Sequence, residues 1–216
     1  VAGWRDYVLG DFMLVKCLKA SNHFMQLDDP FAIYGVKALN DPLTQIFADA
    51  VPAVVRTVLL PYKGEIVYDG LLALANVSFG RNYLNTILDS YHESLARFGL
   101  ITSLPADLNA DEPDPEKLLR TYLRSVHSRE MHEFEIQDLI AAHPELLPVY
   151  HQEQGKVMSR HLKRKLKELG LSPGEYYAVL DSLIVAIAPS QAALKKQLKA
   201  RLPKDKLGWV HCFKLK

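Results

Sequence analysis

The stretch 59–72, LLPYKGEIVYDGLL, decides the fold of this chain. An apolar, largely β-branched run covers 54–60, and the same character resumes over 65–68. Between the two runs, Pro61 presets a turn φ and Gly64 can adopt a left-handed conformation without a steric penalty. The stretch therefore predicts a β-hairpin in which two strands reverse between Pro61 and Gly64.

The segments on either side of the hairpin predict an α+β domain over residues 1–104. Apolar periodicity indicates helices, and β-branched runs between turn clusters indicate strands. Helices are expected over 4–19, 41–50 and 82–98, and strands over 23–27, 31–39, 71–79 and 100–104. Asp41 followed by Pro42 is a typical helix start, and Gly99 is a typical helix end. We expect an antiparallel sheet centred on the 54–78 hairpin, with the 82–98 helix packed against it.

Residues 105–116, PADLNADEPDPE, hold three prolines and five acidic residues and are interpreted as an acidic linker or loop. Beyond them the apolar period becomes helical, which predicts a mainly helical, basic region over 117–216. Its expected helices cover 115–126, 130–142, 146–169, 173–187 and 190–202, and a final strand is possible over 208–215. The predicted fold class is α+β: an antiparallel sheet with packed helices, followed by a mainly helical C-terminal region.

The first half of the chain resembles a known group of proteins in the combination of four motifs: YGVKALNDPL, LLPYKGEIVYDGLL, VSFGRNY and FGLITSLP. The group consists of bacterial and archaeal proteins of unknown function that carry an LLPFKGKIIYDGLL-like hairpin. The resemblance covers about 34–104. It implies a recurrent domain there and supplies no activity, cofactor or site residue.

Composition narrows the class of protein. The 216 residues are 49% hydrophobic and 24% charged, which is ordinary for a soluble globular chain. The longest apolar run, 183–188, is far too short to span a membrane, so no membrane partner is expected. Cys17 and Cys212 lie too far apart in sequence to form a metal knuckle, and no signal peptide is visible. We therefore expect a cytoplasmic protein without a cofactor, and its oligomeric state stays open.

Charge is distributed unevenly along the chain. Residues 151–216 carry 14 basic and 5 acidic groups, a net charge of +9, whereas residues 101–150 carry a net charge of −6. Such asymmetry favours an acidic partner for the C-terminal region. The alternative is that the acidic and basic regions face one another or are simply solvated.

The stretch 156–167, KVMSRHLKRKLK, is the strongest candidate site. On a helix, Met158, Leu162, Leu166 and Leu169 form an apolar stripe, and basic residues gather opposite it. A second basic cluster follows at 195–206. The residues predicted to bind a polyanion are Arg160, Lys163, Arg164, Lys167, Lys195, Lys196 and Lys199. A basic face on an amphipathic helix can equally be a plain solvated surface.

Two further groups could hold a metal ion. Lys63, Glu65 and Asp69 lie on the hairpin, where clustered carboxylates could bind a hard cation. If Ile66 and Tyr68 point inward, both carboxylates lie on the solvated face. The second group contains five of the eight histidines, namely His127, His132, His143, His151 and His161. Their spacing is not the HExxH pattern, in which two histidines four residues apart bind one zinc ion, so no metal ligand is assigned.

The segment 166–183 invites comparison with a helix-turn-helix, because Leu169-Gly170-Leu171-Ser172 resembles the turn of that motif. The expected second helix has two acidic residues and no arginine or lysine, so it suits burial in a structural helix hairpin better than DNA reading.

The sequence contains no motif of a known catalytic activity. The leading hypothesis is a non-enzymatic binding or regulatory module whose basic C-terminal surface contacts nucleic acid or an acidic protein. The alternative is a metal-dependent hydrolase or nuclease of unrecognised type, so whether the chain is an enzyme stays open.

Overall fold

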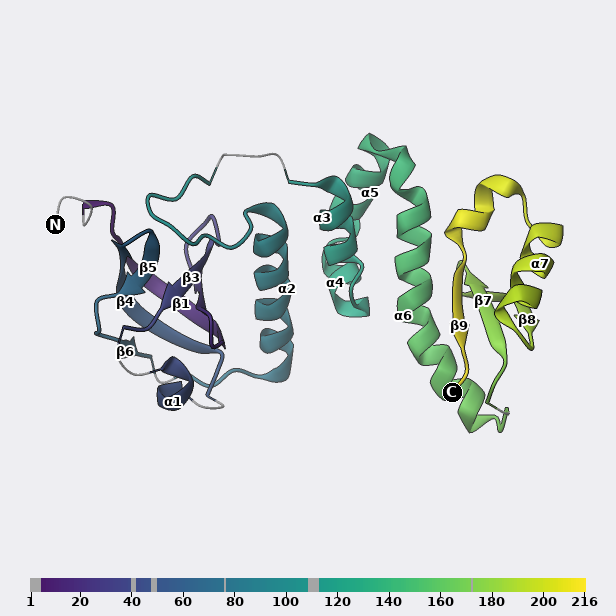
Figure 1. Cartoon of the computed structure of the whole chain (residues 1–216), viewed down its shortest axis with the longest axis horizontal. Coiled ribbons are helices and arrows are strands. Elements are labelled where there is room, and N and C mark those ends of the chain that lie inside the picture. The colour runs from purple at the N-terminus through teal and green to yellow at the C-terminus, as the bar shows by residue number, and fades with distance from the viewer. Residues whose placement is uncertain (1–4, 40–41, 48–49, 76, 109–112, 172) are drawn as a thin grey trace. The chain divides into compact units, whose positions relative to one another are not determined.

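The structure is a computed structural model that describes residues 5–39, 42–47, 50–75, 77–108, 113–171 and 173–216. The chain forms two compact units, Val1–Asp114 and Pro115–Lys216. Both contain a sheet and packed helices, so the α+β class is confirmed (Figure 1). None of the helices in the described ranges is long and apolar enough to cross a membrane.

The first unit is built on a closed ring of five strands. These are β1 (Val8–Cys17), β2 (Asn22–Gln26), β3 (Ile33–Lys37), β4 (Ala53–Tyr62) and β5 (Glu65–Tyr68). Their order is β1-β2-β3-β5-β4, and β4 pairs back with β1 to close a barrel. The β3–β5 pairing is parallel and the other four are antiparallel. With helix α1 (Leu43–Phe47) between β3 and β4, this is the topology of the OB-fold, a small Greek-key barrel.

The barrel interior is a single apolar cluster. It contains Phe12, Leu14, Phe24, Val36, Val55, Leu59 and Ile66 from the five principal strands, together with Leu43 and Phe47 of α1. The short strand β6 (Ala73–Leu74) pairs with β4 beyond the end of β5. The predicted strand over 71–79 is therefore confined to two residues within the part that the structure describes.

The predicted hairpin is confirmed, but its turn is tighter than expected. Tyr62 pairs with Glu65, which leaves only Lys63 and Gly64 in the loop. Their φ angles are 53° and 82°, and two positive values in a two-residue loop define a type I′ turn. Pro61 lies inside β4 opposite Ile66 rather than in the turn. It is tolerated there because β1 pairs with β4 only as far as Leu59.

Helix α2 (Arg81–Arg97) matches the prediction and covers the outer face of β1, β2 and β3 (Figure 1). Its Ile87 and Tyr91 pack against Met13, Met25 and Ile33. The outer side of this part of the barrel is therefore a second apolar core.

The prediction of a helix over 4–19 is wrong, because residues Val8–Cys17 form β1. Phe12 and Leu14 face the barrel interior while Met13 and Val15 face α2, so both sides of the strand are apolar. A strand buried on both faces loses the alternation that identifies it in sequence. The expected strand over 100–104 is also reduced, to a single bridge between Ile101 and Tyr34. Asp41, the predicted helix cap, lies outside the described residues.

The second unit places a three-stranded sheet between two helices. Its helices are α3 (Pro115–Tyr122), α4 (Val126–Met131), α5 (Glu133–Ala142), α6 (Leu147–Glu168) and α7 (Gln191–Arg201), with short 3-10 helices η2 (Pro144–Leu146) and η3 (Lys204–Trp209). The antiparallel sheet has the order β8 (Leu183–Ala188), β7 (Tyr176–Leu180), β9 (His211–Lys214). Helix α6 covers one face of this sheet and α7 covers the other, and α3 packs against α6 (Figure 1).

The prediction of a helix over 173–187 is wrong, because this segment is the β7–β8 hairpin. Tyr177 and Val179 face α6 while Ala178 faces α7, so this strand too is apolar on both sides. Asp181 and Ser182 form its turn, with φ angles of 48° and 67°. The interpretation of 166–183 as a pair of helices, structural or DNA-reading, is therefore wrong.

The other C-terminal predictions are mostly confirmed. Helices α6 and α7 match the expected ranges, and β9 is the predicted final strand. The expected helix over 130–142 is split into α4 and α5 at His132, which has a non-helical φ of −115° and ψ of 32°.

Candidate functional site

The C-terminal half of α6 carries the main basic surface. Its inner side is fixed by Met158, Leu162 and Leu166, which pack against Tyr177 and Phe213 of the sheet. Leu169 was expected in the same stripe, but it is 76% exposed because α6 ends at Glu168. The apolar contact therefore stops at Leu166, one turn earlier than predicted.

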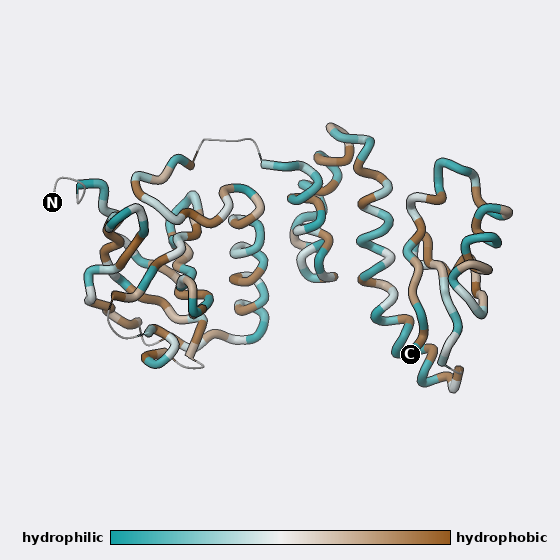
Figure 2. The backbone as a smooth tube through the Cα atoms, viewed as in Figure 1, coloured by the Kyte–Doolittle hydropathy of each residue, from teal (hydrophilic) through white to brown (hydrophobic). Residues whose placement is uncertain are grey.

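Arg160, Arg164 and Lys167 form one exposed row on α6, which we call the α6 basic row. Their spacing of four and three residues places them on one side of the helix, over a length of about 10 Å. Hydrophilic residues dominate this half of α6 in Figure 2. Within the described ranges, one ion pair involves the row: Glu168 Oε1 lies 3.8 Å from Arg164 Nε. The row is thus a largely uncompensated strip of positive charge.

Lys163 lies at the edge of this surface and differs from the row. It is half-buried, and its ammonium lies 5.1 Å from the ring centroid of Phe213 in β9. That distance is within range of a cation–π interaction. Lys163 therefore contributes to packing as well as to charge. The sequence gives no sign of this contact, because Phe213 is 50 positions away.

The second predicted cluster forms a separate surface on α7. Leu194 and Leu198 are buried against the sheet, whereas Lys195, Lys196 and Lys199 are exposed. No ion pair involves these three lysines within the described residues. Because α6 and α7 cover opposite faces of the sheet, the structure divides the predicted residues between two surfaces.

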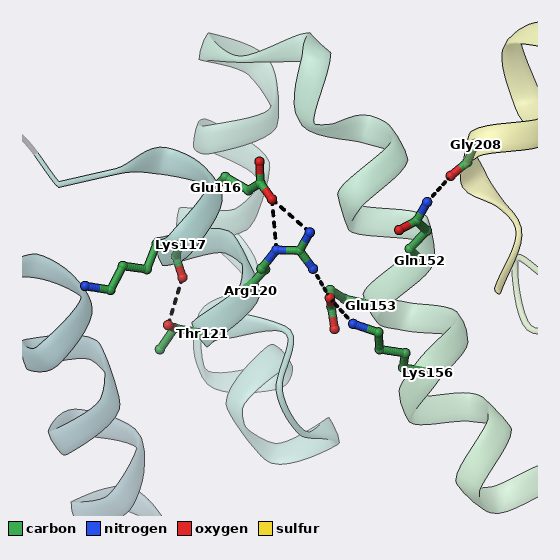
Figure 3. A network of polar contacts seen from close by, with 8 residues as sticks. All are labelled: Glu116, Lys117, Arg120, Thr121, Gln152, Glu153, Lys156 and Gly208. Atoms are coloured by element: carbon green, nitrogen blue, oxygen red, sulfur yellow. Dashed lines mark hydrogen bonds and ion pairs between the residues drawn. The ribbon is translucent and has the colours of Figure 1, made fainter.

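The N-terminal half of α6 serves a structural purpose. Arg120 of α3 donates to Glu116 Oε1 through Nε and Nη2, at 3.0 and 2.8 Å. It also donates to Glu153 of α6, which accepts a further bond of 2.6 Å from Lys156. Figure 3 shows this network, and beside it Gln152, which donates to the carbonyl of Gly208 in η3. These contacts join α6 to α3 and η3 and leave its C-terminal half to present the basic row.

The two hairpin carboxylates do not form a shared site. As the alternation of the strand suggested, Ile66 and Tyr68 are buried while Glu65 and Asp69 are exposed. Glu65 accepts a bond from Lys37 of β3. Asp69 Oδ1 accepts one from the hydroxyl of Thr57 at 3.2 Å and one from the backbone N–H of Leu71 at 3.0 Å. Asp69 thus stabilises the backbone conformation of the segment that follows the hairpin.

The histidines between 127 and 161 are separated from one another by their contacts. Four of them have distinct partners. The Nδ1 atom of His132 lies 2.8 Å from Ser128 O, and that of His143 lies 3.2 Å from Glu145 Oε1. The Nδ1 atom of His151 lies 2.5 Å from Asp181 Oδ1, and that of His161 lies 3.4 Å from Arg164 Nη2. Among the residues that the structure describes, no three His, Cys, Asp or Glu side chains gather closely enough to hold one metal ion.

The barrel of the first unit does not present the face that OB-folds commonly use for ligands. That face lies over the second and third strands. Here α2 covers it, and Met25 of β2 and Ile33 of β3 are 3% and 0% exposed. The face over β2 and β3 is therefore occupied by α2 rather than open to a ligand.

Comparison of the chain with protein-family models, with curated proteins and with solved structures gave no match. The resemblance of 34–104 to the group with the LLPFKGKIIYDGLL-like hairpin stays a prediction.

Proposed function

We propose that this chain is a non-enzymatic binding module whose second unit contacts the phosphates of duplex nucleic acid through the α6 basic row. The observation that carries the proposal is the exposure of Arg160, Arg164 and Lys167 on one side of a helix. The net charge of +9 over residues 151–216 supports it. We infer contact with the phosphate backbone, because all three residues of the row are cationic and phosphate and sugar oxygens receive half or more of all protein–DNA hydrogen bonds.

The C-terminal half of α6 suits this task because its inner side packs on the sheet while Arg160, Arg164 and Lys167 are exposed. Each cation that neutralises a phosphate releases condensed counterions. Three such contacts predict that log K falls with log salt with a slope of about −2.7 from this row alone. A strong salt dependence is therefore the expected signature of binding.

The experiment is a titration of the whole chain with fluorescent random-sequence duplex DNA and duplex RNA over a series of salt concentrations. In the triple variant Arg160→Ala, Arg164→Ala, Lys167→Ala, we expect the slope to shrink by about 2.7 and binding at low salt to weaken by at least tenfold. Lys163 is left unchanged, because its removal would also disturb the packing on Phe213.

The matched control removes the same number of charges from the other face of the sheet. Lys195→Ala, Lys196→Ala, Lys199→Ala should reduce the salt slope by less than about 1, which is less than one phosphate contact. If both triple variants lose affinity equally, binding reflects net charge and the α6 proposal is wrong. If the wild type binds neither duplex at low salt but is retained by polyglutamate, an acidic protein is the better partner.

The metal-dependent hydrolase or nuclease stays a prediction. No contact of Glu65, Asp69 or the histidines in the described ranges favours it.

A further inference from the structure

The first unit contains a cavity that the proposed function does not use. It has a volume of about 540 Å³ and lies between the β1–β2 connection, the end of β3 and the start of α1. Ligand pockets for small molecules commonly measure about 300–1,000 Å³. The polar residues that line it are Lys19, Ser21, Asn22, Lys37 and Thr44.

The described part of the cavity lining is cationic. Lys19 and Lys37 supply two ammonium groups, and none of the described lining residues carries a carboxylate. One carboxylate acts from outside the lining, because Glu65 of β5 pairs with Lys37. The side chains of this pair are 47% and 48% exposed, so water and salt screen their attraction. Lys37 is thus available to an anion that competes with Glu65.

The rest of the cavity offers a fixed polar group and an apolar wall. Asn22 is only 5% exposed, and its amide Nδ2 donates to the carbonyl of Val36 at 3.1 Å. Ser21 and Thr44 add hydroxyl groups, while Leu18 and Leu43 are apolar. A ligand that fits this lining needs a compact negative group for the lysines and a less polar body for the leucines.

We propose that this cavity binds a small organic phosphate, with the phosphate held by Lys19 and Lys37 and the body placed against Leu18 and Leu43. Neither lysine belongs to the α6 basic row, and the cavity lies in the first unit. The proposal is therefore independent of nucleic-acid binding by the second unit.

The test uses the isotope-labelled whole chain and follows amide chemical shifts during titration with AMP, phenyl phosphate, inorganic phosphate and adenosine. Both organic phosphates should shift the amides of Lys19, Ser21, Asn22 and Ala38 at millimolar concentration. Adenosine at the same concentration should leave those amides unchanged, because it lacks the negative group. Inorganic phosphate should bind at least about tenfold more weakly than AMP, because it lacks the body.

Three variants are expected to change the affinity for AMP in different ways. Lys19→Gln should weaken AMP binding by about tenfold, as expected for the loss of one charged hydrogen bond. Glu65→Gln should strengthen AMP binding severalfold, because it frees Lys37. Lys63→Gln is the matched control, since this lysine lies on the hairpin turn and does not line the cavity, and it should leave binding unchanged.

Several outcomes overturn the proposal. These are the absence of a shift with both organic phosphates, equal binding of adenosine and AMP, equal binding of inorganic phosphate and AMP, or equal affinity in the Lys19 and Lys63 variants. Shifts confined to α6 would place the phosphate on the basic row instead and would also overturn it.

Discussion

Gly155 of α6 and His211 of β9 approach so closely that a Cβ atom on Gly155 would lie 2.5 Å from the Cβ of His211. The absence of a side chain at this position lets the strand pack directly against the helix. Gly→Ala normally stabilises a helix interior by about 1 kcal/mol. The sign of the stability change at Gly155 therefore shows whether the close approach of β9 outweighs this helix propensity. We predict that Gly155→Ala instead lowers the free energy of unfolding by about 1–3 kcal/mol through overpacking.

Chemical denaturation measures this effect, and Gly208→Ala is its control in the same unit. The nearest atom to a Cβ on Gly208 would be Pro148 Cβ at 4.0 Å, which is an ordinary contact. Gly208→Ala should therefore stay within about 0.5 kcal/mol of the wild type. Stabilisation of the Gly155 variant would show that α6 and β9 are not in close contact.

The hairpin turn predicts opposite effects at its two residues. Gly64 has a φ of 82° and open space around it, so Gly64→Val should cost about 1–3 kcal/mol through backbone strain alone. Lys63 also has a positive φ, of 53°, and Asn-Gly is the preferred pair in a type I′ turn. We expect Lys63→Asn to stabilise the chain by a few tenths of a kcal/mol, and Lys63→Ala to stay within about 0.5 kcal/mol. Unchanged denaturation midpoints for Gly64→Val would contradict this turn.

The contact between His23 and Tyr91 predicts a pH dependence of stability. His23 Nδ1 lies 2.5 Å from the hydroxyl of Tyr91, which joins β2 to α2. Burial lowers the pKa of His23, and the nearby ammonium of Lys16 lowers it further. The unfolded chain then binds more protons than the folded chain, so stability is complete above about pH 6.5 and is lost as the pH falls towards the lowered pKa.

This prediction is checked by measuring the free energy of unfolding between about pH 7.5 and 5 for the wild type and His23→Gln. The loss of stability on acidification should be smaller in the variant. Tyr91→Phe should lower stability by about 1 kcal/mol at neutral pH, because it removes one partly buried hydrogen bond. Parallel pH curves for the wild type and His23→Gln would show that the pKa of His23 is not lowered by folding.

The ion-pair network of α3 and α6 predicts unequal roles for its two cations. The side chain of Glu153 is only 12% exposed, and it accepts bonds from Arg120 and Lys156. Arg120→Ala should cost about 1–3 kcal/mol, because it separates α3 from α6 and leaves a largely buried carboxylate with one partner. Lys156 is 48% exposed, and Lys156→Ala should cost less than about 0.5 kcal/mol. Equal losses in the two variants, measured by chemical denaturation, would contradict the central position of Arg120.

Local signals in the sequence were sufficient to predict an element where residues close together in sequence determine the backbone conformation. The 54–68 hairpin was predictable because Gly64 and two β-branched runs act over a few residues. The α2 and α6 helices were predictable because each has one apolar stripe and a polar opposite side. The two basic clusters could also be recognised, since charge is a property of composition.

Strands that are buried on both faces were not predictable. The apolar pattern predicts helices over Val8–Cys17 and Tyr176–Leu180. Both faces of each strand are packed against other elements, so apolar residues occur on both sides and the alternation of apolar and polar residues is lost. Only the tertiary structure shows that α2 covers one strand and α6 and α7 cover the other.

The sequence by itself determined the α+β class, the left-handed backbone position at Gly64 and the residues that make the C-terminal region basic. Tertiary structure decided that β4 closes on β1 to form a barrel, that Arg160 and Lys195 lie on opposite sides of a sheet, and that Lys19 and Lys37 line one cavity. The reason is physical: turn and helix preferences act between near neighbours, whereas ring closure, burial on two faces and cavity lining depend on residues tens of positions apart.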